Sequence, residues 1–132
     1  MRTFNPLVPL VLLVTQSVPT QAADLSGAWA SDSSVCDKVF TRENNKLAFR
    51  PDADLYAGGV IVQGKQITGR FQKCTVKSLH DDGSNVQVKA SCSDGVAVSD
   101  VTFEMKISGE NQITLSSKAP VPMEMPYVRC SL

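Results

Sequence analysis

The chain has 132 residues, and its 13 Lys and Arg residues balance 13 Asp and Glu residues, so the formal net charge at pH 7 is zero. Nucleic acids and anionic membranes recruit proteins through an excess of basic residues, so neither is expected as a partner. The length suits a single domain with one hydrophobic core.

Residues 1–22 have the three parts of a secretion signal: a short start with Arg2, an apolar run at Leu7–Val14, and an exit of small residues. The apolar run is much shorter than the roughly 20 residues that span a bilayer. We therefore expect a signal peptide over 1–22, Ala23 as the first mature residue, and one periplasmic or secreted domain over 23–132.

The remaining segments read as strands, because they are short, rich in Val, Ile, Thr and Phe, and divided by Gly, Asn, Asp and Ser. After a first strand at Leu25–Trp29 they are 59–64, 66–71, 74–80, 85–92, 101–108 and 112–117. One helical turn is expected at 53–59. Three prolines near the end favour an extended, unpaired crossing before a last strand at Tyr127–Cys130. The fold class is all-β: a small antiparallel barrel of about seven or eight strands, or a sandwich, with two disulfides.

The segment around Gly83 predicts a β-hairpin, and pairing its strands about that residue sets their register. The opposed residues are then His80 with Val86, Ser78 with Val88, Val76 with Ala90, and Cys74 with Cys92. Opposed Cβ atoms lie about 4.5 to 5.5 Å apart, close to what a disulfide needs.

Four cysteines in an exported chain indicate two disulfides, and no Cys-x-x-Cys spacing suggests zinc or thioredoxin chemistry. The register favours Cys74 with Cys92, which leaves Cys36 for Cys130 and ties the first strand to the last. The alternative, Cys36 with Cys74 and Cys92 with Cys130, remains open.

The same register places Lys77 opposite Lys89, with Lys73 further along the same face. Like charges opposed in this way are unfavourable. The face is either a solvated outer surface or a small basic stripe for an acidic partner.

No enzymatic site is expected. His80 is the only histidine, and it stands beside Asp81 and Asp82 at a predicted turn with no nucleophile motif near it. With the cysteines paired, no thiol remains as a nucleophile. His80 therefore reads as a surface turn residue, and no cofactor is predicted.

Met123 and Met125 lie on one side of an extended segment between prolines, and their thioethers are soft ligands suited to Cu(I). Together with His80 and Trp29 they resemble the sites of small periplasmic copper carriers of efflux systems, whose barrel uses a Met-x-Met, a histidine and a tryptophan. The alternative is that both methionines pack on the barrel end.

The first strand carries a second resemblance. The run Leu25, Ser26, Gly27, Ala28, Trp29 resembles the first strand of the calycin-like barrels, namely lipocalins, avidins and bacterial metalloprotease inhibitors, and in the inhibitors a cysteine follows, as Cys36 does here. The whole layout is similar to small exported four-cysteine proteins of α-proteobacteria whose function is unknown. The resemblance implies that Trp29 plugs one barrel end and that Ala23–Leu25 enters a protease cleft.

These features predict a non-catalytic, monomeric binding protein that takes a protein or a small ligand in the periplasm or outside the cell. Its most concrete form is an inhibitor of a secreted hydrolase, either a protease or lysozyme. The expected partner contacts are Ala23, Asp24, Leu25, Lys73, Lys77 and Lys89. The alternative is a Cu(I)-type metal-binding protein that uses Met123 and Met125, with His80 as a third ligand.

Overall fold

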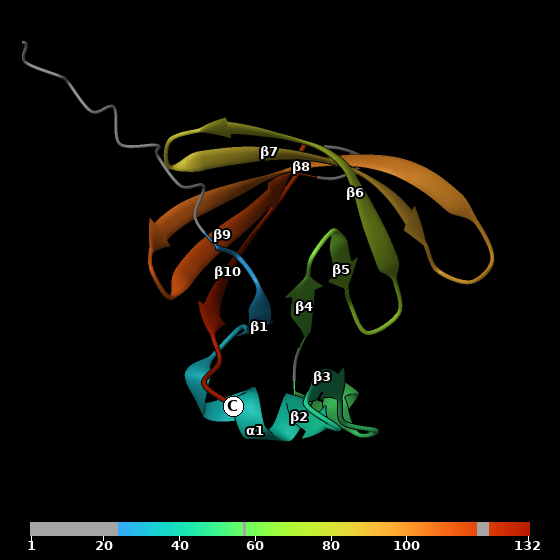
Figure 1. The fold of residues 1–132 in the computed structure, drawn as a ribbon, viewed down its shortest axis with the longest axis vertical. Coiled ribbons are helices and arrows are strands. Elements are labelled where there is room, and N and C mark those ends of the chain that lie inside the picture. Colours follow the sequence, from blue (N-terminus) through green and yellow to red (C-terminus); the bar gives the residue numbers. More distant parts are fainter. Residues whose placement is uncertain (1–23, 57, 119–121) are drawn as a thin grey trace, which may run out of the picture.

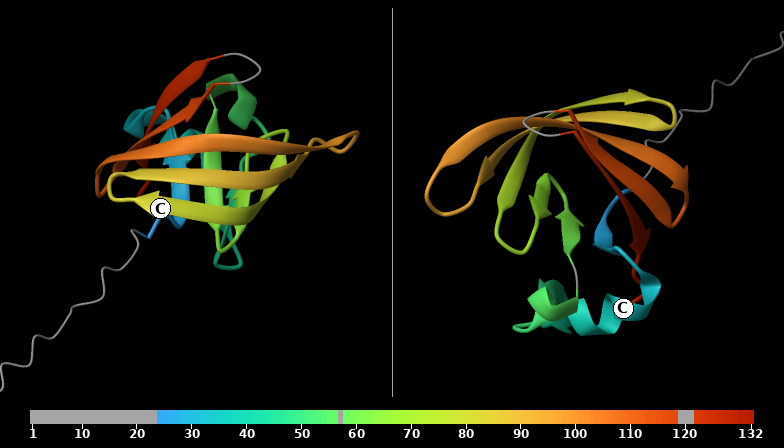
Figure 2. Two further views of the ribbon diagram at one scale, coloured as in Figure 1. Left: turned by 90° about the horizontal axis from the view of Figure 1, so that it is seen from above. Right: turned by 180° about the vertical axis from the view of Figure 1, so that it is seen from behind.

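The fold is described from a computed structural model, for residues 24–56, 58–118 and 122–132. Eight strands form a closed antiparallel barrel in the spatial order β1-β10-β9-β8-β7-β6-β5-β4 (Figures 1 and 2). The barrel strands are β1 Gly27–Ala30, β4 Gly59–Gln63, β5 Gln66–Thr68, β6 Lys73–Asp82, β7 Asn85–Ser93, β8 Val98–Gly109, β9 Gln112–Ser117 and β10 Met123–Arg129. The barrel, and not the sandwich, is therefore the correct one of the two predicted architectures.

The segment between β1 and β4 stays outside the barrel. It contains η1 Ser33–Val35, α1 Cys36–Val39, the hairpin β2 Phe40–Glu43 and β3 Lys46–Phe49, and η2 Ala53–Tyr56. The predicted helical turn is η2, whereas α1 and the β2–β3 hairpin were not predicted. The proposed signal peptide and Ala23 lie outside the described residues.

The last strand is longer than predicted. β10 pairs with β9 from Met123 onward, so Met123–Pro126 is not the unpaired crossing expected from its prolines. The backbone N–H of Arg129 donates to the carbonyl of Asn111, just before β9, and that of Cys130 donates to the carbonyl of Ala28 on β1, so amide directions alternate along the strand. Pro126 is four residues before Cys130, so its backbone nitrogen points in the same direction as that of Cys130, toward the edge of β10 that pairs with β1. Because β1 reaches only Val128 and Arg129, the missing N–H disrupts no pairing there.

The predicted disulfides are both present. Cys74 lies directly opposite Cys92 and is bonded to it, and Cys36 is bonded to Cys130. The alternative pairing is therefore wrong. A bulge between Val76 and Ser78 shifts the rest of the β6–β7 register by one residue.

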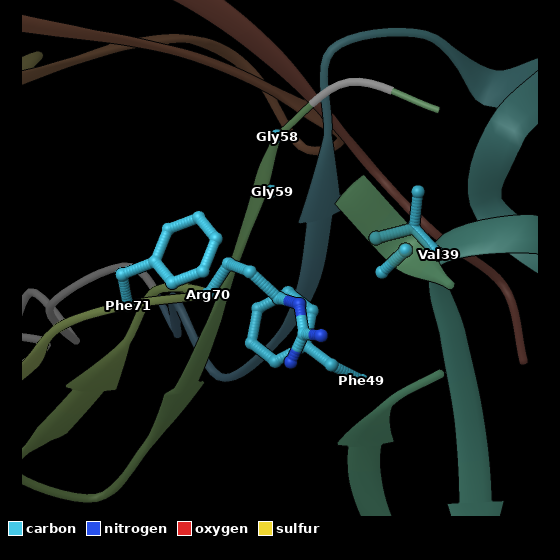
Figure 3. A pocket seen from close by; sticks show the side chains of 7 residues that line it. Val39, Phe49, Gly58, Gly59, Arg70 and Phe71 are labelled. Atoms are coloured by element: carbon cyan, nitrogen blue, oxygen red, sulfur yellow. The ribbon is translucent and has the colours of Figure 1, made fainter. Parts of the chain in front are cut away.

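An outer layer covers one side of the barrel, over β1 and β4. Buried side chains from this layer and from the outward faces of the two strands form one cluster: Ala28, Ala30, Cys36, Val39, Phe40, Ala53, Ile61 and Cys130. The contact is close enough to require glycine at position 59, where a Cβ would stand 2.6 Å from Phe40 Cζ. A small pocket of about 170 Å³ remains between this layer and Arg70 and Phe71 (Figure 3).

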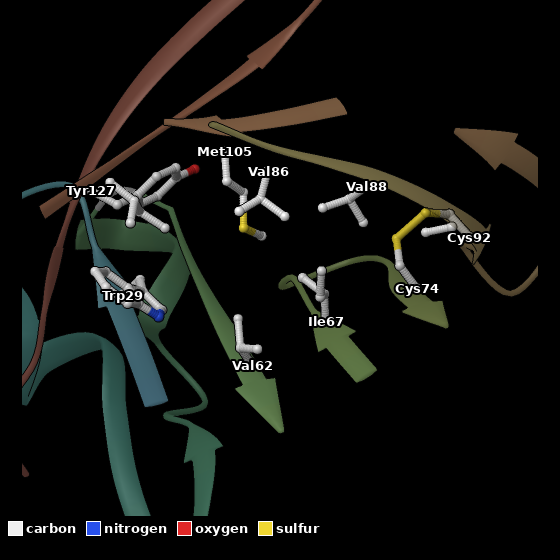
Figure 4. Close-up of a cluster of buried hydrophobic side chains, with 11 residues drawn as sticks. Trp29, Val62, Ile67, Cys74, Val86, Val88, Cys92, Met105 and Tyr127 are labelled. Atoms are coloured by element: carbon white, nitrogen blue, oxygen red, sulfur yellow. A yellow bond between two sulfur atoms is a disulfide. The ribbon is translucent and has the colours of Figure 1, made fainter. Parts of the chain in front are cut away.

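The barrel interior holds the larger core (Figure 4). Its buried members are Trp29, Val62, Ile67, Cys74, Val86, Val88, Ala90, Cys92, Met105, Ile113 and Tyr127. These positions alternate with exposed ones along β7, as expected for a strand with one buried face. Ile67, Cys74 and Tyr127 of this core extend to the end of the barrel opposite the start of β1.

Trp29 closes the end of the barrel at which β1 begins. Its indole is fully buried, and Nε1 donates to the Leu25 carbonyl at 3.0 Å. The guanidinium carbon of Arg129 lies 4.4 Å from the indole ring centroid. Gly27, at φ +135°, makes room for this guanidinium, because a Cβ there would lie 3.3 Å from Nη1. We call this arrangement the closed end.

Candidate functional site

A cavity of about 480 Å³ opens at the end of the barrel opposite Trp29, and we call it the mouth cavity. Its walls come from the ends of six strands and from the loop between β5 and β6. The lining residues are Val60, Ile67, Gly69, Gln72, Cys74, Ser99, Val101, Phe103, Leu115, Ser116, Ser117, Met123, Met125 and Tyr127. None of these described residues carries a charge at neutral pH, so the cavity is suited to an uncharged apolar group.

The alternating pattern of β8 and β10 builds the apolar wall. Val101 and Phe103 occupy every second position of β8 and line the cavity, while Met105, two residues further, is buried below it. On β10 the same period brings Met123, Met125 and Tyr127 to the cavity. The cavity therefore continues the inward face of strands whose lower halves form the core.

Tyr127 places one polar group in this apolar wall. Its hydroxyl donates to Met125 Sδ at 3.8 Å. Burial raises the pKa of the Tyr127 phenol, so the group is neutral at physiological pH and keeps its proton for donation. The cavity thus offers weak polar contacts and no fixed charge.

The predicted metal ligands do not come together. Met123 and Met125 both line the mouth cavity, but His80 lies in a groove with Asp82, Asn85, Gln87 and Glu104 near the β6–β7 turn. That turn is at the opposite end of β6 from the mouth. No group of three or more His, Cys, Asp or Glu side chains within the described ranges is placed to hold a metal.

The predicted basic stripe is corrected in its register. Because of the bulge in β6, Lys89 lies opposite Ser78 and not opposite Lys77. The like-charge repulsion expected for the two lysines is therefore absent, and Lys77 Nζ pairs with Asp100 Oδ1 at 2.8 Å. Of the three lysines, Lys73 alone stands at the mouth, at the start of β6.

Asp24 and Leu25 are attached to the closed end. Arg129 Nη2 donates to the Asp24 carbonyl at 2.7 Å, and Trp29 Nε1 donates to that of Leu25. The Ser26 amide donates to the Asp24 carboxylate at 2.9 Å and lowers the pKa of that group. These residues therefore lie at the end of the barrel away from the mouth cavity.

Comparison of the chain with protein-family models, with curated proteins and with solved structures found no match in any of the three. The small closed antiparallel barrel is consistent with the calycin-like resemblance at the level of architecture. Two disulfides indicate an oxidising environment outside the cytoplasm. Within the described ranges, no helix has the length and apolar character to cross a bilayer.

Of the residues that line the mouth, Cys74 was predicted as a disulfide partner and Met123 and Met125 as candidate metal ligands, whereas Val101, Phe103 and the other lining residues were not predicted. Their signal is the alternation of β8, where Val101 and Phe103 are separated by the polar Thr102. The walls from the loop after β5 had no such signal. The β2–β3 hairpin was also not predicted, although the pair Asn44–Asn45 is a local signal for it. Both residues have positive φ, as the tight turn of this hairpin requires.

Proposed function

We propose that this protein is an exported, non-catalytic binding protein that holds a small apolar ligand in the mouth cavity. The observation that carries the proposal is the cavity itself, about 480 Å³ with mainly apolar side chains and no charged one among its described lining residues. Burial of apolar surface in such a space contributes about 25 cal/mol per Å² before the cost of association.

Filling the cavity is expected to weaken ligand binding. Val101→Trp places an indole in the space that the ligand needs, and we expect the affinity for the neutral fluorescent probe N-phenyl-1-naphthylamine to fall about tenfold or more, a loss of about 1.4 kcal/mol. The measurement is a fluorescence titration of the purified protein.

Thr102→Trp is the matched control, because Thr102 is the next residue of β8 and is exposed. It should leave probe affinity unchanged. Equal affinity of both variants, with folding verified by circular dichroism, would contradict a ligand site in the mouth.

Metal binding is a second candidate function, favoured by the position of Met123 and Met125 on one wall of the mouth cavity. If these thioethers bind Cu(I), the double variant Met123→Leu/Met125→Leu should lose affinity in a competition titration with bicinchoninate. His80→Gln should not, because His80 lies at the other end of β6. Equal Cu(I) affinity of the wild type and the double methionine variant would exclude this function.

Inhibition of a secreted hydrolase remains a prediction, and no contact of the described residues favours it over ligand binding. Deleting Ala23–Leu25 would remove inhibition if these residues enter a protease cleft. Because Trp29 and Arg129 bind the carbonyls of Leu25 and Asp24, a thermal melt of the deleted protein must accompany the inhibition assay.

A further inference from the structure

A surface groove adjoins the mouth cavity. It measures about 600 Å³ and runs past the loop between β5 and β6 and the turn between β7 and β8. Gly69 and Gln72 line both the groove and the cavity, so one short loop separates the two spaces. The Gly69 amide donates to the Gln72 carbonyl at 2.7 Å, which holds this loop in a tight turn.

The groove differs from the cavity in charge. Two of its described lining residues, Arg70 and Lys73, are cationic, and one, Asp94, is anionic. The Asp94 carboxylate accepts the backbone N–H groups of Val96 and Ala97, both at 2.9 Å, and these bonds hold the pKa of Asp94 below its usual value. The carboxylate is thus engaged by its own turn, whereas Lys73 is exposed at the start of β6.

The groove also has apolar surface beside its cations. Phe49 and Phe71 both line it, and the side chain of Phe71 is 74% exposed. The Arg70 guanidinium lies 5.7 Å from the centroid of the Phe71 ring and donates to the Pro51 carbonyl at 3.1 Å (Figure 3). This contact fixes a positive charge near an exposed ring at the edge of the mouth.

A charged group inside the mouth cavity would lose its hydration without gaining a charged partner among the described residues. The charged group of a ligand must therefore lie outside the mouth cavity. The groove on the other side of Gly69 and Gln72 provides positive charge next to the cavity. Building on the proposed function, we infer that the ligand is an amphiphile with one anionic head group. Its apolar chain occupies the mouth cavity, and its head group lies in the groove against Lys73.

The inference is tested with probes that share one chain and differ only in the head group: dodecanoate, dodecyl phosphate, dodecanol and dodecyltrimethylammonium. Each is titrated against the complex of the wild-type protein with N-phenyl-1-naphthylamine, the ionic probes below their micelle concentrations and dodecanol below its solubility limit. We expect both anions to bind about fivefold more tightly than dodecanol, the size of an exposed ion pair, and the cation to bind most weakly. The ratio of the anions separates a phosphate head from a carboxylate, and higher salt should reduce the preference for both.

Lys73→Gln should remove most of this preference and leave the affinity for dodecanol unchanged. Lys106→Gln is the matched control, because Lys106 is an exposed lysine near the other end of β8. Equal affinity for all four probes, or an anion preference that survives in Lys73→Gln, would overturn the inference while the proposed function stands. Failure of every probe to bind would instead contradict the proposed function.

Discussion

Removing the Cys36–Cys130 disulfide by Cys36→Ser/Cys130→Ser should lower the free energy of unfolding by about 4.7 kcal/mol. The bond joins residues 94 positions apart, and the entropy that a crosslink removes from the unfolded chain grows with the length of the closed loop. It also connects α1 to the residue that follows β10, so its loss removes the covalent link between the outer layer and the last strand. Urea unfolding followed by circular dichroism measures the change.

The Cys74–Cys92 disulfide is the internal control. Its cysteines are 18 positions apart, and the same entropy argument gives about 3.2 kcal/mol for Cys74→Ser/Cys92→Ser. The two variants should also differ in amide hydrogen exchange: loss of the first bond should increase exchange more in α1 and η2 than in β6–β9. A larger loss of stability for the shorter loop would contradict the role given to the long-range bond.

Most strands of the barrel were predictable because each carries its own local signal. Segments 85–92 and 112–117 alternate apolar and polar residues between turn-forming residues, and they became β7 and β9. The disulfide pairing followed from one further step, since an antiparallel hairpin centred near Gly83 makes Cys74 and Cys92 neighbours. Local pattern and register together determined the closed sheet.

The wrong predictions concern segments whose structure depends on contacts with distant parts of the chain. The bulge after Val76 changed the neighbours of Lys77, although no residue type in that strand signals an extra residue. The proline-rich segment at Met123–Pro126 became a strand because β9 offers a partner on one side and β1 ends before reaching it on the other. Neither fact is visible in the segment itself.

In the candidate site, too, some features follow from a local sequence pattern and others depend on contacts between distant segments. The apolar wall of the mouth cavity follows the period of β8 and β10, so it could have been read from the sequence. The groove depends on the loop at Gly69–Gln72 meeting the turn at Ser93–Gly95, two segments with no shared pattern. The placement of charge beside the cavity is therefore a property of the tertiary fold.

Trp29→Ala should destabilise the protein by about 3 to 5 kcal/mol, the range for removing a buried aromatic side chain. The indole is fully buried at the closed end, donates to the Leu25 carbonyl, and lies against the Arg129 guanidinium. Its loss leaves a space that β1 cannot fill by collapse, because β1 is paired on both sides. Thermal and urea unfolding by circular dichroism measure the effect without depending on the fluorescence of the only tryptophan.

Trp29→Phe separates packing from the Nε1 hydrogen bond. It keeps most of the apolar volume but loses the Nε1 donor, so we expect a smaller cost of about 1 to 2 kcal/mol, within the range for a lost hydrogen bond. Because Trp29 lies at the closed end with Leu25 and Arg129 and is not among the residues that line the mouth cavity, this variant should bind N-phenyl-1-naphthylamine as the wild type does. Loss of probe binding in a folded Trp29→Phe protein would show that the ligand reaches the closed end. The placement of the binding site in the mouth cavity alone would then be wrong.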